Sequence, residues 1–336
     1  MIIHVIIILG DKMRIKNYLK RINEVAYKNN KSTVLMFIDV MIWYIFYGAT
    51  LTDYLNYEFY NRSFKERKKY AVVRTQNKFY KKVSPPEYKE FFTIKPNFLN
   101  NFKEYIGRTF YVPEDGLDSL KKFLKDNKEF MIKPIDGLGG ADVKKMKNTD
   151  VKNKEEFLNY LKDNRMFLEE LIIQHKKMST LSPSSVNTLR VMTFVNKGRS
   201  EILYAALRVG NGVNEVDNFH KGGMGVSINT REGKLKGEAI DKDLNHFKKH
   251  PKTNIYFNNY EIPYWKEVKE LVLKAALVNQ KIQVVGWDVA ITKNGPVLVE
   301  GNRRPGFDLV QVLSKRGRKD IMYHVLNERS KKWKYL

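Results

Sequence analysis

The chain has 336 residues, which is enough for one large domain or for two to three small ones. A hydrophobic content of 43% and the absence of cysteine exclude a disordered chain, a disulfide scaffold, a thiol nucleophile and a cysteine-ligated metal site. The formal charge of +24 (61 basic against 37 acidic residues) favours a polyanionic partner. No nucleic-acid-binding signature accompanies the charge, so anionic lipid or acidic polysaccharide is favoured over nucleic acid.

The first ninety residues are predicted to form a helical region. The apolar run 1–9 lacks the basic start and the cleavage site of a signal peptide. Apolar residues recur at three- and four-residue spacing from 12 to about 70. The stretch 34–49 contains Asp39 and is shorter than the ~20 residues that span a bilayer, so we expect a buried core helix. We expect a cytoplasmic protein. The alternative for this stretch is an interfacial helix resting on a membrane, which would make the protein peripheral at the inner face of the cell membrane.

Mixed helices and strands follow the break at Ser84-Pro85-Pro86. The patterns predict helices over 117–127, over 154–163 and after Pro263, a loop-rich segment over 210–262, and strands over 130–134, 166–173, 188–196, 201–209, 284–292 and 297–301. Tight turns join the last two strands, and also the pair on either side of Lys197-Gly198, so the fold class is α+β with antiparallel pairs rather than a parallel sheet.

The segment 286–306, GWDVAITKNGPVLVEGNRRPG, carries the strongest chemical signal. Asp288 lies on one predicted strand, and Glu300 and Asn302 lie on the strand that folds back against it. The alternation of side chains can bring these three to one face, where hard oxygen ligands suit Mg²⁺. The alternative is an ordinary hairpin with exposed polar residues.

A glycine-rich segment, FMIKPIDGLGGADV (130–143), is a candidate phosphate loop. Lys133 ends the predicted strand, and Gly137, Gly139 and Gly140 permit close approach of the backbone to phosphate. The spacing matches neither the dinucleotide-binding nor the NTPase fingerprint, so the segment alone is a weak signal.

The segment FLEELIIQH (167–175) places Glu169 and Glu170 among large apolar residues. One interpretation is an edge strand with solvated acids, and the other is a hinge that binds adenine. The sequence pattern alone does not decide between them.

Together these segments resemble the ATP-grasp superfamily. NTLRVMT (187–193), AALRVGNGVNEVDNFHKGG (205–223) and GPVLVEGNRRPGFDLVQ (295–311) are similar to the sugar-transfer-associated ATP-grasp family, and the resemblance covers roughly 40–315. It implies two α+β lobes that hold ATP between them. The implied organisation is an N-terminal helical region over 1–90, a small ATP-binding lobe over 91–165 and a C-terminal lobe over 166–336.

The resemblance also implies roles for individual residues. Asp288, Glu300 and Asn302 would bind Mg²⁺, with two ions expected and Mn²⁺ as an alternative. The implied ATP-binding residues are Lys103 (in Phe-Lys where the family has Asp-Lys), Lys133, Gly137, Gly139, Gly140, the hinge residues Glu169, Glu170, Leu171 and Ile172, and the ribose-contacting Asn187. The implied catalytic residues are Arg190, Arg208 and Asn218, although each arginine could instead pair with a surface acid.

The function that the resemblance implies is an ATP-dependent carboxylate–amine ligase acting through an acyl phosphate in capsule, exopolysaccharide or other surface-glycan biosynthesis. Its expected partners are ATP, an acidic sugar, sugar nucleotide or lipid-linked glycan, and an amine such as an amino acid. One alternative is an ATP-dependent kinase acting on a sugar or a lipid-linked sugar. The other is a non-catalytic ATP-grasp module in a glycan-assembly complex.

Overall fold

The computed structural model describes residues 12–136, 143–183, 185–212 and 222–330. The described chain divides into two compact units. Unit 1 holds the residues up to Phe79 together with Gly306–Leu326, and unit 2 holds Tyr80–Pro305 and the residues from Asn327. Gly306–Leu326 therefore groups with the N-terminal helices, whereas the predicted region 166–336 places it in the C-terminal lobe.

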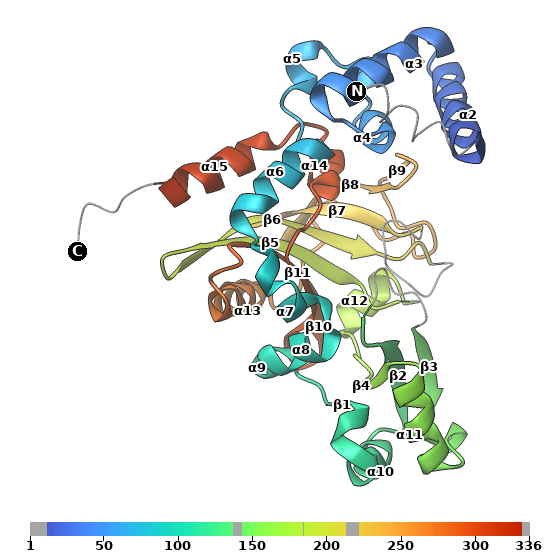
Figure 1. Ribbon diagram of the computed structural model, residues 1–336, viewed down its shortest axis with the longest axis vertical. Helices are drawn as coiled ribbons and strands as arrows, with labels where there is room; N and C mark the ends of the chain where they lie inside the picture. The colour runs from blue at the N-terminus through green and yellow to red at the C-terminus, as the bar shows by residue number, and fades with distance from the viewer. Residues whose placement is uncertain (1–11, 137–142, 184, 213–221, 331–336) are drawn as a thin grey trace. The chain divides into compact units, whose positions relative to one another are not determined.

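Unit 1 is helical, as the sequence predicts (Figure 1). Its helices are α2 (Lys12–Lys28), α3 (Thr33–Ile42), α4 (Leu51–Asn56), α5 (Phe64–Arg67), the start of α6 (Val73–Val83), α14 (Asp308–Ser314) and the start of α15 (Lys319–Ser330), with a π-helical turn at Trp43–Tyr47 and a 3₁₀ turn at Phe59–Asn61. Its interior is aromatic: the centroid of the Phe59 ring lies 4.9 Å from that of Trp43 and 5.4 Å from that of Tyr70. Buried Gln311 accepts from the Ala71 N–H and so joins α14 to the segment before α6.

The stretch 34–49 is helical over most of its length, as predicted, but the prediction that it is a buried core helix is wrong. Helix α3 buries Met36 and Val40, but Val34 is 67% exposed, and Phe46 in the following turn is 71% exposed. Asp39, an acid in this apolar stretch, forms an ion pair with Arg67 at 2.7 Å. Unit 1 therefore buries only some of the apolar side chains of α3 and leaves the others exposed.

Unit 2 contains a four-stranded antiparallel sheet in the order β1-β4-β2-β3. Its strands are β1 (Phe110–Tyr111), β4 (Met166–Glu170), β2 (Glu129–Pro134) and β3 (Lys144–Lys147), and α10 (Gly116–Asp126) and α11 (Lys154–Asp163) pack against it (Figure 1). Leu120, Phe130, Leu161 and Leu168 are completely buried in its core. The helices predicted over 117–127 and 154–163 and the strand predicted over 130–134 are confirmed.

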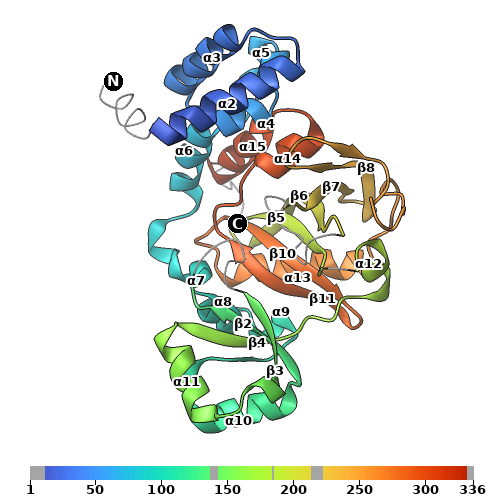
Figure 2. The same cartoon turned by 90° about the vertical axis from the view of Figure 1, so that its right-hand side faces the viewer.

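A seven-stranded antiparallel sheet forms the rest of unit 2, in the order β11-β10-β5-β6-β7-β8-β9 (Figure 2). The strands are β5 (Thr188–Asn196), β6 (Arg199–Val209), β7 (Met224–Asn229), β8 (Lys234–Asp241), β9 (His246–Phe247), β10 (Val284–Thr292) and β11 (Gly295–Asn302). The helices are α7 (Glu90–Thr93), α8 (Lys95–Asn101), α9 (Lys103–Ile106), α12 (Lys176–Leu181) and α13 (Trp265–Val278), and 3₁₀ turns lie at Pro86–Tyr88, Pro113–Asp115 and Asn148–Asp150. The Lys197-Gly198 hairpin is confirmed by the pairing of β5 with β6.

The loop-rich segment predicted over 210–262 contains three strands, β7 to β9. Strand β8 reads KLKGEAID, with a glycine and charged residues that weaken any strand pattern. Pairing between neighbours decides the structure here, because β8 is hydrogen-bonded to β7 on one side and β9 on the other.

Candidate active site

A row of charged side chains crosses the large sheet. Glu300 on β11 lies opposite Asp288 on β10, and Asp288 lies opposite Arg190 on β5. The Asp288 carboxylate forms ion pairs with Arg190 at 2.6 Å and with Arg208, from β6, at 2.8 Å. The neighbours of Asp288 on its strand, Trp287 and Val289, are buried in the hydrophobic core. Since side chains alternate along a strand, the sheet keeps one face for the core and presents the charged row on the other.

The two carboxylates of this row have opposite pKa shifts. Burial raises the pKa of Glu300 to about 7, and the charge of Asp288 and a hydrogen bond between the two side chains add to this effect. Glu300 nevertheless reaches solvent, so protein atoms surround the carboxylate without closing it off. Burial also opposes ionisation of Asp288, but Arg190 and Arg208 outweigh it and hold the Asp288 pKa below its usual value. When both carboxyl groups are ionised they repel each other, and a cation bound between them and the solvent would reduce that repulsion.

These residues fit Mg²⁺, which prefers a few carboxylate oxygens together with phosphate oxygens. Asn302 lies two residues beyond Glu300, opposite Gly286 in the pairing of β11 with β10, and its Oδ1 accepts from the Arg304 N–H at 2.9 Å. Within the described ranges, no group of three or more His, Cys, Asp or Glu side chains is arranged to hold a metal. A metal here would therefore depend on Asp288, Glu300, a non-acidic ligand such as Asn302, and substrate oxygens.

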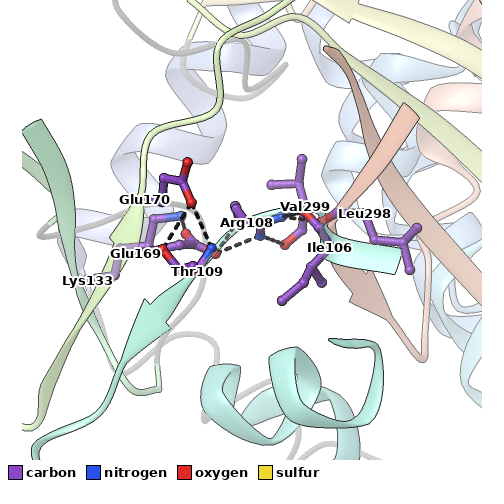
Figure 3. Close-up of polar contacts among 8 residues, drawn as sticks. All are labelled: Ile106, Arg108, Thr109, Lys133, Glu169, Glu170, Leu298 and Val299. Atoms are coloured by element: carbon purple, nitrogen blue, oxygen red, sulfur yellow. Dashed lines mark hydrogen bonds and ion pairs between the residues drawn. The ribbon is translucent and has the colours of Figure 1, made fainter. Parts of the chain in front are cut away.

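A second cluster lies where the small sheet meets β11 (Figure 3). Glu169, on β4, is 2% exposed and forms ion pairs with Arg108 and Lys133. Arg108 also donates to the main-chain oxygens of Leu298 and Val299 on β11, at 2.6 and 3.2 Å. Glu169 is therefore a buried anion between two cations, which excludes the alternative of a solvated acid on an edge strand.

The predicted hinge follows this cluster directly. Glu170 accepts from the N–H and hydroxyl of Thr109, and so fixes β4 to the start of β1 (Figure 3). Leu171 and Ile172 follow the end of β4, and Gln174 then pairs with Thr292 at the end of β10. The segment therefore connects the two sheets, and its contact with adenine stays a prediction.

Two basic residues near Lys133 were missed by the sequence analysis. Arg108 precedes a strand of two residues, and no local pattern marks its burial. Lys95, at the start of α8, donates to the main-chain oxygen of Pro134 at 2.9 Å. Burial lowers the pKa of Lys95, an effect that the Glu300 carboxylate opposes and the Lys133 charge reinforces. Lys103, expected to be the first ATP lysine, is exposed on α9, whereas Lys95 lies within electrostatic reach of the site.

The other predicted site residues have varied surroundings. Asn187 is fully buried, and its amide donates to Gln174 Oε1 and to the main-chain oxygens of Met178 and Ser182. In this arrangement its amide supports the turn after α12, and its contact with ribose stays a prediction. Gly137, Gly139, Gly140 and Asn218 lie outside the described residues.

Comparison with known proteins gives one family match. The model of the family described as "Sugar-transfer associated ATP-grasp" matches residues 56–327, which is most of the chain. No curated protein matches the chain.

Solved structures of ATP-grasp proteins resemble the chain at low identity. It is similar to the ATP-grasp ligase PsnB in complex with a minimal precursor, with 16% identity over 72% of this chain and 63% of that chain, and a TM-score of 0.43. It is also similar to D-cycloserine synthetase DcsG, with 13% identity over 74% of this chain and 73% of that chain, and a TM-score of 0.39. It is similar as well to the D-alanine-D-alanine ligase from Coxiella burnetii, with 11% identity over 71% of this chain and 61% of that chain, and a TM-score of 0.36.

Proposed function

Because the chain belongs to the sugar-transfer associated ATP-grasp family, we propose that it is an ATP-dependent carboxylate–amine ligase. The observation that carries the proposal is the row of Glu300, Asp288, Arg190 and Arg208 on the face of the sheet opposite the hydrophobic core, where Glu300 reaches solvent. Two acids suited to a metal lie beside two fixed cations suited to a transferring phosphoryl group. The substrates follow from the family description alone, and we propose an acidic sugar, sugar nucleotide or lipid-linked glycan as carboxylate donor.

In the proposed reaction the donor carboxylate attacks the γ-phosphorus of ATP, and the bond to ADP breaks. An amine nitrogen then attacks the acyl carbon, phosphate leaves, the amide forms and the amine loses a proton. When bound, Mg²⁺ held by Glu300 and Asp288 would neutralise charge on the phosphates. Arg190 and Arg208 are already fixed by Asp288, so their positive charge needs little reorganisation when charge develops on the transferring group. Lys133 and Lys95 would hold the phosphates, Lys95 taking the part that the sequence analysis gave to Lys103.

The intermediate tests this proposal. With ATP, Mg²⁺ and a panel of uronic acids and amino acids as donors, hydroxylamine in place of the amine should yield a donor hydroxamate together with ADP and phosphate. Mass detection of the hydroxamate checks the result. A stable phosphate ester that hydroxylamine does not attack would show a kinase, and AMP with pyrophosphate would show an adenylating enzyme. Either outcome contradicts the ligase.

We also propose that α3 lies on an anionic membrane surface. Val34, Ile38, Ile42 and Phe46 follow one another at four-residue spacing, and each is at least 43% exposed, so they form one apolar stripe. Among the described residues, no helix is both long and apolar enough to cross a membrane, so the stripe would lie in the interface. The net charge of +24 complements anionic headgroups.

Sedimentation with vesicles tests the membrane proposal. The double change Val34→Glu and Ile38→Glu, at two positions of the stripe, should weaken binding to phosphatidylglycerol vesicles by more than about tenfold, because exposed apolar area is lost and negative charge is added. Val278→Glu, which adds one negative charge at a 44% exposed apolar site at the end of α13, is a control for added charge away from the stripe and should bind normally. Binding that is equal for the double variant and wild type would contradict the proposal.

A further inference from the structure

Unit 1 contains a pocket that the proposed ligase chemistry does not use. The pocket has a volume of about 520 Å³, within the range of roughly 300–1,000 Å³ typical of small-molecule sites. Its walls come from residues 62–70, before α6, and from residues 315–323, which follow α14 and include the start of α15. These two segments are about 250 positions apart in the sequence, but both lie in unit 1. The candidate ligase residues all belong to unit 2.

The lining of this pocket is strongly basic. Six of its residues are cationic and two are acidic: Arg62, Lys68, Lys69, Lys315, Arg316 and Lys319 against Glu66 and Asp320. Both acids are already used, since the Ser63 N–H and hydroxyl donate to Glu66 and Arg318 donates to Asp320. In the described chain no acid pairs with Lys69, Lys315 or Arg316. Arg62 pairs with Glu58 at 3.8 Å, so the pocket keeps an excess of positive charge that comes chiefly from Lys69, Lys315 and Arg316.

Hydrogen bonds to the main chain hold the two segments that carry these cations against each other. The Lys319 N–H donates to the Lys69 oxygen at 3.0 Å, and the Lys319 ammonium donates to the Lys68 oxygen at 2.7 Å. Gly317 lies so close to this strand of chain that an added Cβ would stand 2.2 Å from the Lys69 carbonyl carbon. Only glycine permits that approach, so the two basic segments are held in contact by main-chain packing.

Tyr70 provides a second, independent observation. Its side chain is 2% exposed and lines this pocket and a neighbouring one of about 230 Å³, yet its buried hydroxyl has no hydrogen-bond partner in the described structure. Burial raises the Tyr70 pKa to about 12, so the hydroxyl keeps its proton and can donate. A buried donor without a partner is costly, and a ligand at either pocket whose acceptor reached this hydroxyl would remove that cost.

We propose that this pocket, which Tyr70 helps to line, binds the diphosphate group of a phosphorylated ligand. Several converging cations favour a multivalent anion over a single carboxylate, and the arginines can contact phosphate oxygens in a bidentate manner. The volume leaves room for part of the group that the diphosphate carries. The same diphosphate chemistry occurs in soluble nucleotides and in prenyl-linked lipids.

Calorimetric titration of the full chain with inorganic pyrophosphate tests the site. Lys69→Gln with Arg316→Gln should weaken binding at least tenfold, and Tyr70→Phe should weaken it several-fold by removing one donor. The control pair Lys16→Gln and Lys28→Gln removes the same charge from exposed positions on α2 and should leave affinity unchanged. Lys133→Met should retain this binding, which separates the pocket from the proposed ATP site. Pyrophosphate binding that survives the pocket changes and is lost in Lys133→Met would overturn the proposal and leave the ligase proposal standing.

Two further arms identify the source of the diphosphate, using UDP in solution and phosphatidylcholine vesicles that carry a minor fraction of a prenyl diphosphate. If one of these probes binds the wild type and the pocket variant binds it more weakly, the result supports the site and identifies that probe's class as the source of the diphosphate. If the pocket variant changes neither, the inference is wrong. Thermal unfolding without ligand shows whether each variant is folded. Addition of pyrophosphate should then raise the Tm of proteins with an unchanged pocket, and should raise it less in a folded pocket variant.

Discussion

Replacing Glu169 by alanine should lower the free energy of unfolding by about 3–5 kcal/mol, because it leaves two buried cations without their shared anion. Arg108 and Glu169 are each only 3% exposed at the side chain, and Lys133 is 18% exposed. Solvent therefore reaches these groups far less than it reaches an ion pair on the surface, and it compensates less for the lost carboxylate. Urea unfolding of wild type and variant measures the difference.

The matched control is Asp136→Ala. Asp136 forms an ion pair with Arg165 at 3.0 Å, but these side chains are 56% and 65% exposed. Its removal should cost less than about 1 kcal/mol, since exposed ion pairs contribute little. A Glu169→Ala protein as stable as Asp136→Ala would show that the buried cluster does not stabilise unit 2.

Glu300→Gln should reduce magnesium-dependent ATP turnover by about 100-fold or more, the size of effect seen when one preorganised charged contact at a reacting group is removed. The fold should be retained, because Glu300 lies beside another carboxylate and the change removes a like-charge contact. Asp288→Asn should lose turnover and also stability, since Arg190 and Arg208 both depend on Asp288. ADP release measured over a magnesium titration, together with urea unfolding, separates the two effects.

Glu261→Gln, an exposed acid in unit 2 that pairs with Lys177 and Lys234, is the control for this pair and should keep full turnover. Turnover within twofold of wild type for Glu300→Gln would remove the metal role from Glu300. Equal stability of Asp288→Asn and wild type would show instead that the arginines do not need their partner.

The sequence predicted the central strands well because their signal is local. Strands β5 and β10 have the predicted bounds, since each is a run of β-branched and large apolar residues buried on the core face. The three strands within 210–262 were missed because glycines and charged residues interrupt them. Their identity depends on neighbours in the sheet, which a pattern within one segment does not contain.

The candidate site divides in the same way. The turn between β10 and β11 is short, so the sequence could predict that Asp288 and Glu300 face each other, and the register confirms it. Arg108 could not be predicted, because its partner Glu169 is 61 positions away. The exposed stripe of α3 was misjudged because hydrophobicity alone does not say whether a folded unit has room to bury a side chain.

Arg108 joins two parts of the chain through a single guanidinium. One edge donates to Glu169 on the strand that enters the predicted adenine hinge, and the other donates to the main chain of β11, next to Glu300. Movement of β4 relative to β11 would therefore change the geometry of both contacts. A nucleotide at the predicted hinge and a cation at the predicted site beside Glu300 would therefore both act on this one set of hydrogen bonds. If one of these ligands changed the affinity for the other through Arg108, linkage requires that the second change the affinity for the first by the same factor.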